Sequence, residues 1–194
     1  MIKLLIYDIT GVLTKSERFS VQYSELFGIP YESVLSFFKS DFQNCLIGKS
    51  DLKREIKPWL EKWKSVYDPD SFLELWFKLE NDIDIEIFRS VFQLQEKEYE
   101  TVIATHQEKY RLKYIKETMK LDRVFERIYS SCNLGIKKNN PDFFRTILSD
   151  YGLKPEEAVF FDNDKKNIES AKSLGIDAVL VENNKDYFDR VNKL

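Results

Sequence analysis

Three polar residues stand at the ends of short apolar runs, where a carboxylate or a hydroxyl could do chemistry. These residues are Asp8, Thr105 and Asp162. Short apolar runs are typical of strands covered on both faces of a parallel sheet, and the carboxyl ends of such strands meet at one edge. We therefore expect the three side chains to converge, so that carboxylates can attack an electrophile or ligate a cation beside a hydroxyl donor. Taken singly, each residue could equally cap the helix or turn that follows it.

The elements that would position these residues alternate along the chain. Strands are predicted at residues 2–8, 101–105, 128–130, 158–162 and 178–181, and helices are predicted to begin near residues 85, 108, 141 and 165. Asn140 before Pro141 suits the start of a helix. Gly152 and Gly175 are placed as residues that end helices. This alternation predicts an α/β fold with a doubly wound, Rossmann-like parallel sheet.

A block with a different pattern lies between the first strand and this alternating region. Across residues 16–84 the apolar residues recur at helical spacing, and all three tryptophans fall there. One apolar stripe comprises Ile56, Trp59, Leu60, Trp63 and Val66. We expect a helical cap, residues 16–84, inserted into a core of residues 1–15 and 85–194. Because open α/β sheets bind ligands beyond the carboxyl ends of their strands, a lid at this point would cover the site.

The aromatic stripes of the block are interpreted as the packed interior of a small helical bundle rather than as a substrate platform. Three positions in the block could still face the site: Tyr31, Phe42 and the region of Cys45.

The composition excludes several classes of function. The chain has 194 residues with 30 basic and 33 acidic side chains, and its net charge of −3 gives no field that would attract nucleic acid or an anionic membrane. Cys45 and Cys132 are too few for a disulfide framework and lack zinc-ligand spacing. Asp8 interrupts the apolar run of residues 1–13, so we expect neither a secretory signal nor a membrane span there. A cytoplasmic protein, monomeric or homodimeric, is the expectation.

The residues around the three polar positions resemble the motifs of a known family. Residues 8–14, Asp-Ile-Thr-Gly-Val-Leu-Thr, resemble the first motif of the haloacid dehalogenase (HAD) superfamily, and Thr105 looks like its second. Residues 135–142, Gly-Ile-Lys-Lys-Asn-Asn-Pro-Asp, are similar to the third motif and align Lys138 with its functional lysine. Residues 159–169 look like the acidic fourth motif. The resemblance spans essentially the whole chain, and the helical block matches the small cap of the family's first subclass.

This resemblance implies a phosphoryl-transfer site. Asp8 would be the nucleophile that forms an aspartyl phosphate, and Mg²⁺ would offset the repulsion between the carboxylate and the substrate. The implied metal ligands are Asp8, the backbone carbonyl of Thr10, Asp162 and Asn163. The implied catalytic residues are Asp8, Thr10, Thr105 and Lys138, and the implied substrate-binding residues are Gly11, Thr105, His106 and Lys138. Without the motif around it, Lys138 would be interpreted as a solvated surface lysine.

Two positions depart from the family's pattern. Thr10 stands where family phosphatases usually carry an aspartate that serves as general acid and base, and a threonine hydroxyl cannot carry a proton back and forth near neutral pH. Asn163 stands where many relatives have a second acidic residue, and its neutral amide is a weaker magnesium ligand. Asp162 or Asp164 could compensate. His106, the only histidine, could carry the proton, although orienting its loop or contacting substrate is the preferred interpretation.

Two functions from different classes follow. The leading hypothesis is a magnesium-dependent phosphomonoester hydrolase acting on a small organic phosphate, and the motifs most resemble those of sugar-phosphate phosphatases such as the glucose-1-phosphatase-like proteins. The alternative is a catalytically weak or inactive relative that binds a phosphorylated metabolite or a protein partner, which positions 10 and 163 keep open. Dehalogenase chemistry uses the same nucleophile without metal, but Lys138 and the acidic fourth motif suit a phosphate better than a halide.

Overall fold

A five-stranded parallel sheet forms the centre of the core in the computed structural model, which describes residues 1–194. The strands lie in the order β3-β2-β1-β4-β5, with every neighbouring pair parallel. Their bounds are β1 Leu4–Tyr7, β2 Glu100–Thr105, β3 Arg127–Ser130, β4 Ala158–Asp162 and β5 Asp177–Leu180. The chain leaves β1 toward β2 on one side and returns to β4 on the other. The carboxyl end of β1 is therefore the switch point at which doubly wound sheets bind ligands.

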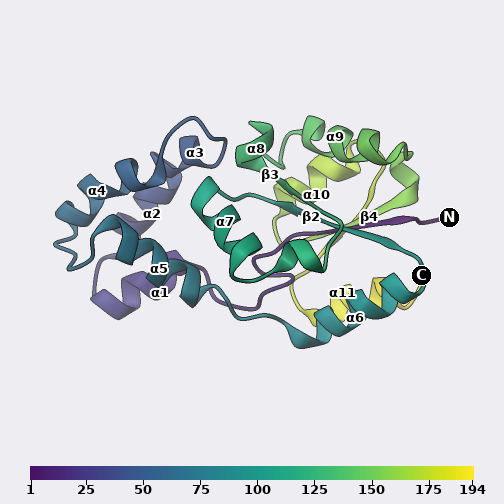
Figure 1. Ribbon diagram of the computed structural model, residues 1–194, viewed down its shortest axis with the longest axis horizontal. Coiled ribbons are helices and arrows are strands. Elements are labelled where there is room, and N and C mark those ends of the chain that lie inside the picture. Colours follow the sequence, from purple (N-terminus) through teal and green to yellow (C-terminus); the bar gives the residue numbers. More distant parts are fainter.

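Helices cover both faces of the sheet, which confirms the predicted doubly wound α/β fold (Figure 1). Alternate residues of β1 point to opposite faces, with Leu5 and Tyr7 in one buried cluster and Leu4 and Ile6 in the other. The first cluster takes side chains from α6 (Ile85–Glu96), α7 (Lys109–Glu117) and α11 (Asn184–Val191). The second takes them from α9 (Pro141–Tyr151) and α10 (Lys165–Lys172). Short helical turns fill the connections: η1 (Leu121–Arg123), α8 (Ser131–Leu134) and η2 (Pro155–Glu157).

The predicted helix ends agree with the structure for α9 and differ for α10. Asn140 caps α9 by accepting from the Asp142 N–H, and Gly152 ends the same helix in the left-handed conformation. Helix α10 ends earlier than predicted, at Lys172, and Gly175 falls in the turn beyond it. Helix α11 was not predicted, although a capping box formed by Asn183 and Asp186 marks its start.

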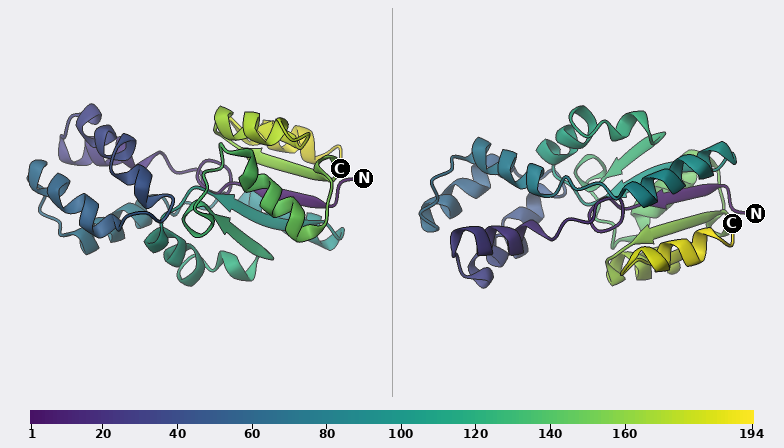
Figure 2. Two further views of the ribbon diagram at one scale, coloured as in Figure 1. Left: turned by 90° about the horizontal axis from the view of Figure 1, so that it is seen from above. Right: turned by 90° about the horizontal axis from the view of Figure 1, so that it is seen from below.

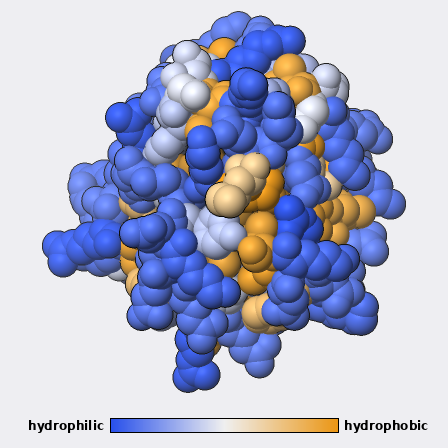
Figure 3. Space-filling model, turned by 90° about the vertical axis from the view of Figure 1, so that its right-hand side faces the viewer, coloured by the Kyte–Doolittle hydropathy of each residue, from blue (hydrophilic) through white to orange (hydrophobic).

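The sheet is oriented with its carboxyl ends toward the helical block (Figures 1 and 2). Both chain termini lie at the opposite end, where the Tyr99 hydroxyl donates to the backbone carbonyl of Leu194 at 3.0 Å. That end is mostly hydrophilic, with a small apolar area at its middle (Figure 3). None of the helices combines the length and the apolar character that crossing a membrane would need. The polar strand ends therefore face the inserted block and not the termini.

Five helices make up the inserted block: α1 (Phe19–Phe27), α2 (Tyr31–Lys39), α3 (Phe42–Cys45), α4 (Leu52–Lys62) and α5 (Pro69–Leu79). They enclose their own buried cluster, in which Phe19 stacks on Trp76 with ring centroids 5.1 Å apart. The prediction of a packed aromatic interior holds for Ile56, Leu60 and Trp63. It is wrong for Val66, which is 89% exposed because α4 ends at Lys62, before the stripe reaches it.

Two adjacent segments connect this block to the sheet. The Lys15 N–H donates to the Asp82 carbonyl and the Asp84 N–H donates to the Leu13 carbonyl, each at 2.9 Å. Thr14 and Ile83 form an antiparallel bridge between them. All five helices of the block lie between these crossings, which supports the proposed division into a cap of residues 16–84 and a core.

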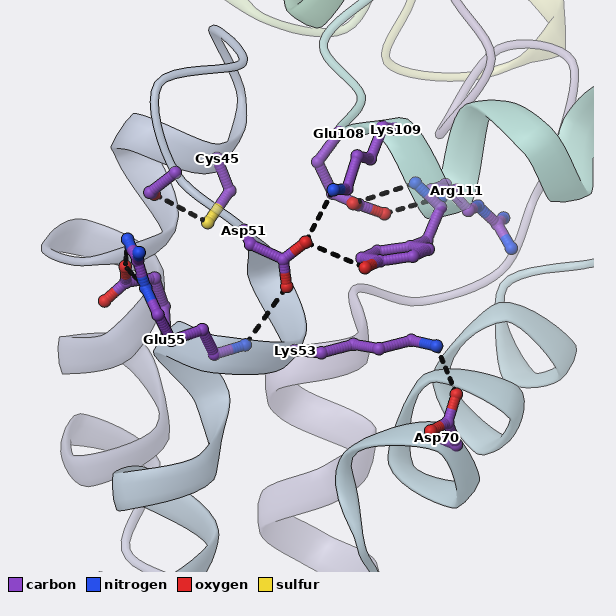
Figure 4. Close-up of polar contacts among 11 residues, drawn as sticks. Cys45, Asp51, Lys53, Glu55, Asp70, Glu108, Lys109 and Arg111 are labelled. Atoms are coloured by element: carbon purple, nitrogen blue, oxygen red, sulfur yellow. Dashed lines mark hydrogen bonds and ion pairs between the residues drawn. The ribbon is translucent and has the colours of Figure 1, made fainter.

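Helix α7 of the core contacts the cap at two places. At the first, Asp51 caps α4 and accepts from the Tyr110 hydroxyl at 2.8 Å and from the Lys109 ammonium at 2.5 Å (Figure 4). At the second, the buried Arg111 guanidinium donates to the backbone carbonyls of Phe77 at 2.7 Å and Glu80 at 3.2 Å. The hydrogen bond from Lys109 is the main reason why the pKa of Asp51 falls from 3.8 to about 2. One turn of α7 thus fixes the position of the cap over the site.

We expect Asp51→Asn to destabilise the protein by up to about 1 kcal/mol near pH 7, the usual range for a partly exposed ion pair. Asparagine keeps the shape and the helix-capping ability of aspartate but loses the charge. Because the folded-state pKa of Asp51 is depressed, its contribution is complete above about pH 4 and is lost as the pH falls toward 2. Urea unfolding of the parent and variant at pH 7, 4 and 3 measures the difference, which should shrink at the lowest pH.

Asp122→Asn is the control, since this exposed carboxylate in η1 makes no ion pair. A difference between parent and Asp51→Asn that stays constant from pH 7 to pH 3 would contradict a role for the Asp51 charge.

Candidate active site

A cavity of about 180 Å³ lies at the carboxyl edge of the sheet, below the cap. No hydrophobic residue lines it, which is unusual for a small-molecule site and suits a strongly polar group. The lining residues come from the loop after β1, the start of the cap, the loop after β2, the loop before α9 and the start of α10. They are Asp8, Thr10, Gly11, Ser16, Arg18, His106, Gln107, Lys138, Asp162, Asn163, Asp164 and Asn167.

Lys138 joins the two strand-end carboxylates. Its ammonium donates to Asp8 Oδ1 at 2.5 Å and to Asp162 Oδ2 at 2.6 Å, and only 1% of the residue is exposed. Lys138 is therefore not a solvated surface lysine. Burial works against the charged amine, but the charges of Asp162 and Asp8 outweigh it and raise the pKa of Lys138 above its ordinary value. The lysine is a fixed positive charge at the end of β1.

Asp8 lies between this cation and the open cavity. It is 7% exposed, and burial raises its pKa to about 7 although Lys138 opposes the shift; the nearby Asp162 raises it further. The two carboxylates repel one another, and a single lysine does not neutralise both. A further positive charge in the cavity would stabilise the ionised form of Asp8.

The residues after β4 have separate tasks. Asp162 is fully buried and accepts hydrogen bonds from the Asp164 backbone N–H at 2.7 Å and from Asn167 Nδ2 at 3.1 Å, in addition to Lys138. Asp164 caps α10, its carboxylate accepting from the Lys166 N–H at 2.8 Å, and it also lines the cavity. Asn167 was missed by sequence analysis; its position in the first turn of the helix predicted to begin near residue 165, directly after the acidic motif, was the available signal.

Asn163 lies directly over Gly11. A Cβ atom added at Gly11 would lie 1.9 Å from Asn163 Nδ2, and Gly11 has a φ of +87°, which side chains rarely adopt. Glycine is therefore required here both for the turn and for the close approach of the loop after β4. Asn163 itself is exposed, so its amide can face the cavity without breaking a hydrogen bond in the protein.

His106 is held in a neutral form. Its Nε2 accepts the backbone N–H of Lys138 at 2.6 Å, and burial, helped by the charges of Lys138 and Lys137, lowers its pKa to about 3. A nitrogen that accepts this bond cannot also take a proton from a substrate. The contact ties the loop after β2 to the loop that carries Lys138, which agrees with the preferred interpretation that His106 orients a loop.

The two remaining predicted site residues, Thr10 and Thr105, differ in whether they line the cavity. Thr10 lines the cavity. Thr105 ends β2 as predicted but is fully buried and does not line the cavity, and its hydroxyl has no hydrogen-bond partner in the protein. A buried hydroxyl without a partner is available to an acceptor at the adjacent strand ends.

Arg18 and Gln107 also line the cavity and were not predicted. Arg18 precedes α1, is exposed, and forms no ion pair with any carboxylate of the chain. Nothing in the sequence distinguishes it among 30 basic residues, because only the folding of the cap brings it over the strand ends.

The oxygen atoms around the cavity suit a hard divalent cation. No three acidic, histidine or cysteine side chains are grouped closely enough to hold a metal by themselves. Mg²⁺ usually keeps several waters and needs only one or two carboxylates, together with carbonyl or amide oxygens. Asp8, Asp164, the amide of Asn163 and the backbone of Thr10 offer this donor set, whereas Asp162 already accepts three hydrogen bonds.

Comparisons with proteins of known structure agree with this fold. A HAD-like family hydrolase from Porphyromonas gingivalis has a TM-score of 0.81 and 21% identity, covering 100% of this chain and 99% of the other. A HAD family enzyme from Bacteroides thetaiotaomicron, in complex with magnesium and inorganic phosphate, has a TM-score of 0.76 and 21% identity, covering 92% and 93%.

Among characterised proteins, one similar sequence matches only a short segment of a much longer protein, and another matches most of this chain at low identity. Drimenol cyclase drtB of Aspergillus calidoustus is 39% identical over 57 residues, which is 29% of this chain but only 11% of that protein. Flavin mononucleotide hydrolase 1 of Arabidopsis thaliana is 23% identical over 167 residues, covering 79% of this chain and 66% of the other. The sequence model of the haloacid dehalogenase-like hydrolase family matches residues 2–175 of this chain. With the parallel sheet and the four motifs gathered at its edge, this match shows that the chain belongs to the haloacid dehalogenase-like hydrolases.

Proposed function

We propose that the protein is a magnesium-dependent phosphomonoester hydrolase that acts on a small organic phosphate through an aspartyl phosphate on Asp8. The observation that carries the proposal is the buried Lys138, which holds Asp8 and Asp162 together at the edge of a cavity lined only by polar and charged residues and glycine. The neighbour of known structure bound to magnesium and phosphate, and the relative that hydrolyses flavin mononucleotide, support the choice of a phosphate over a halide.

Each side chain of the site would have a separate role in the reaction. A carboxylate oxygen of Asp8 attacks phosphorus, the bond from phosphorus to the ester oxygen breaks, and water then attacks the aspartyl phosphate to release phosphate and restore Asp8. Lys138 supplies a fixed positive charge, and the unpartnered Thr105 hydroxyl is a donor for a phosphoryl oxygen. Mg²⁺, held by Asp8, the Thr10 carbonyl and the loop after β4, would neutralise charge on the phosphoryl oxygens.

Neither the residue at the family's acid and base position nor the histidine of this site can transfer a proton to the leaving group. Thr10 occupies the position of the family's acid and base, and His106 is neutral with its Nε2 already engaged. Lys138 is tied to two carboxylates. The parent protein is therefore expected to be a slow phosphatase for esters whose leaving group needs a proton. This keeps open the second candidate function, a relative that binds a phosphorylated ligand with little or no turnover.

A phosphatase assay decides between the two candidates. Sugar phosphates, nucleotides and an aryl phosphate are incubated with the purified protein in the presence and absence of Mg²⁺, and released phosphate is measured. Magnesium-dependent release that is lost on chelation supports the hydrolase. No release from any ester, together with saturable binding of a phosphate ester by calorimetry, would favour the binding protein.

We expect Asn163→Asp to lower the Mg²⁺ concentration that gives half-maximal activity, by up to about tenfold if the new carboxylate gains about 1.4 kcal/mol of binding. Asn163 is exposed at the cavity and packs over Gly11, so the isosteric substitution needs no rearrangement of the loop. Magnesium titrations of activity, and of the thermal unfolding temperature without substrate, both measure the effect.

Asn192→Asp is the matched control, because Asn192 is exposed at the end of α11, near the opposite end of the molecule. Equal titration midpoints in the parent and in Asn163→Asp would show that position 163 does not contact the metal.

A further inference from the structure

The polar cavity is continued toward the cap by a second cavity of a different character. This second cavity has a volume of about 230 Å³ and shares Thr10, Arg18, His106 and Gln107 with the first. We call it the cap chamber. Five of its seven other lining residues are aromatic or aliphatic and come from α1, α2, α3 and α5: Phe19, Leu35, Phe38, Phe42 and Trp76. Together the two cavities reach the size of an ordinary small-molecule site, roughly 300–1,000 Å³.

Contacts between aromatic rings fix the apolar walls of the cap chamber. The rings of Phe38, Phe42 and Trp76 contact one another in pairs, with centroids 5.1 to 5.3 Å apart and mostly edge to face. Phe42 and Trp76 are 8% and 5% exposed, so their positions are set by the interior of the cap. Leu35 and Phe38 are only partly buried and offer free apolar surface to the chamber. Of the three positions left open by sequence analysis, Phe42 lines this chamber, Cys45 is buried and Tyr31 is exposed at the surface.

The polar lining residues of the cap chamber are the four shared with the polar cavity, together with Ser20 and Glu80. Glu80 is buried, accepts the Phe19 backbone N–H at 3.0 Å and lies 3.9 Å from the Arg111 guanidinium. Its pKa is raised mainly by burial, which Arg111 opposes. Arg18, by contrast, forms no ion pair and stands where the two cavities meet. A guanidinium at such a place can bond a phosphoryl oxygen on one side or lie against an aromatic ring on the other.

On this basis we propose that the cap chamber receives the organic part of the substrate, and that this part carries a compact apolar ring, most simply an aromatic one. The inference rests on the proposed phosphatase function, because the phosphate would occupy the polar cavity that shares four lining residues with the chamber. A ring placed against Leu35 and Phe38 gains free energy in proportion to the apolar surface removed from water. Sugar hydroxyls placed against Leu35 and Phe38 would lose hydrogen bonds to water without finding partners on these two side chains. The expected substrate class is therefore an aryl-bearing phosphate monoester and not a simple sugar phosphate.

The test must separate this recognition from the chemistry of the leaving group. A phenyl phosphate is easy to cleave because phenolate leaves without a proton, whatever the chamber binds. We therefore compare two primary alkyl esters, 2-phenylethyl phosphate and glucose 6-phosphate, whose leaving alkoxides both need a proton. The parent should show a kcat/KM at least about tenfold higher for 2-phenylethyl phosphate, mainly through a lower KM.

Variants locate the preference in the chamber. Phe38→Ala and Leu35→Ser should each reduce the ratio of the two kcat/KM values by about threefold to tenfold. Two substitutions are used so that a folding defect in one does not decide the matter. Phe92→Ala is the matched control, since Phe92 is an exposed phenylalanine of α6 that lines neither cavity, and it should leave the ratio unchanged.

A binding measurement keeps the inference separate from the phosphatase proposal. The dissociation constants of 2-phenylethylphosphonate and methylphosphonate, which cannot be hydrolysed at an ester bond, are compared by calorimetry in the presence of Mg²⁺. Tighter binding of the phenylethyl compound that is weakened in Phe38→Ala supports the chamber, even if no ester is turned over and the phosphatase proposal fails. Turnover of both esters with equal or sugar-favouring kcat/KM, or a preference unchanged in both chamber variants, would overturn the inference and leave the phosphatase standing.

Discussion

Asp8→Asn is expected to reduce phosphoester turnover by at least about 10⁴-fold, a loss of the size found when an enzyme's nucleophile is removed. The amide of asparagine is not a nucleophile toward phosphorus and cannot form an aspartyl phosphate. The substitution also removes the carboxylate that Lys138 contacts at the mouth of the polar cavity. Single-turnover and steady-state release of phosphate from the best ester in the panel measure the loss.

The fold should survive this change. Lys138 keeps its contact with Asp162 Oδ2 at 2.6 Å, so the buried ammonium is not left without a partner. The carboxyl group of Asp8 is itself costly to bury in its ionised form, as the rise of its pKa to about 7 indicates, mainly through loss of solvent. Thermal unfolding of the variant is therefore expected to resemble that of the parent.

Asp142→Asn is the control, because Asp142 lies close in sequence to Lys138 but is exposed on α9 and does not line the cavity. A folded Asp8→Asn protein that hydrolyses esters at the parent rate would exclude the covalent mechanism. The remaining carboxylates of the cavity would then have to activate water directly.

The sheet and its central chemistry could be predicted because they depend on local pattern and on topology. An apolar run that ends in a carboxylate is visible in the sequence at residues 2–8 and 158–162. Parallel strands that are neighbours must bring their carboxyl ends together, and Asp8 and Asp162 do meet, at the ammonium of Lys138. The lysine was placed by the resemblance of its loop to a family motif, since its own spacing carries no such information.

The rest of the site depends on contacts between distant segments. Arg18 reaches the cavity only because the cap folds back over the strand ends, and α7 fixes that position through Asp51 and Arg111. Phe38 lies in the helical block and packs against its buried cluster, and only the placement of the cap beside the core makes it line the cap chamber. Likewise, the sequence offers Asp162 and Asp164 as equivalent carboxylates, whereas Asp162 is buried in hydrogen bonds and Asp164 caps a helix beside the cavity.

Thr10→Asp is expected to accelerate the hydrolysis of alkyl phosphates by up to about 10²–10⁴-fold, the usual contribution of general acid and base catalysis. Thr10 lines both the polar cavity and the cap chamber, so a carboxyl group there would lie between the phosphate and its leaving group. Among the other titratable side chains of the cavity, His106 Nε2 accepts a backbone N–H, Lys138 is held by two carboxylates, and Asp164 caps α10 and is proposed as a metal ligand. An aryl phosphate should gain much less, since its phenolate departs without a proton.

The same reasoning predicts the fate of the intermediate. Without a base at position 10, water attacks the aspartyl phosphate slowly, so the phosphorylated parent should accumulate and be trapped by acid quench, and Thr10→Asp should abolish the accumulation. Thr10→Asn is the matched control, because asparagine has the shape of aspartate but cannot exchange a proton near neutral pH. The deciding measurement is the ratio of aryl to alkyl rates in the parent and the two variants. A parent that is already fast on alkyl phosphates, with no gain in Thr10→Asp, would mean that another group carries the proton. A parent inactive on every ester but rescued by Thr10→Asp together with Asn163→Asp would identify the natural protein as a phosphate-binding relative in which these two substitutions have switched off catalysis.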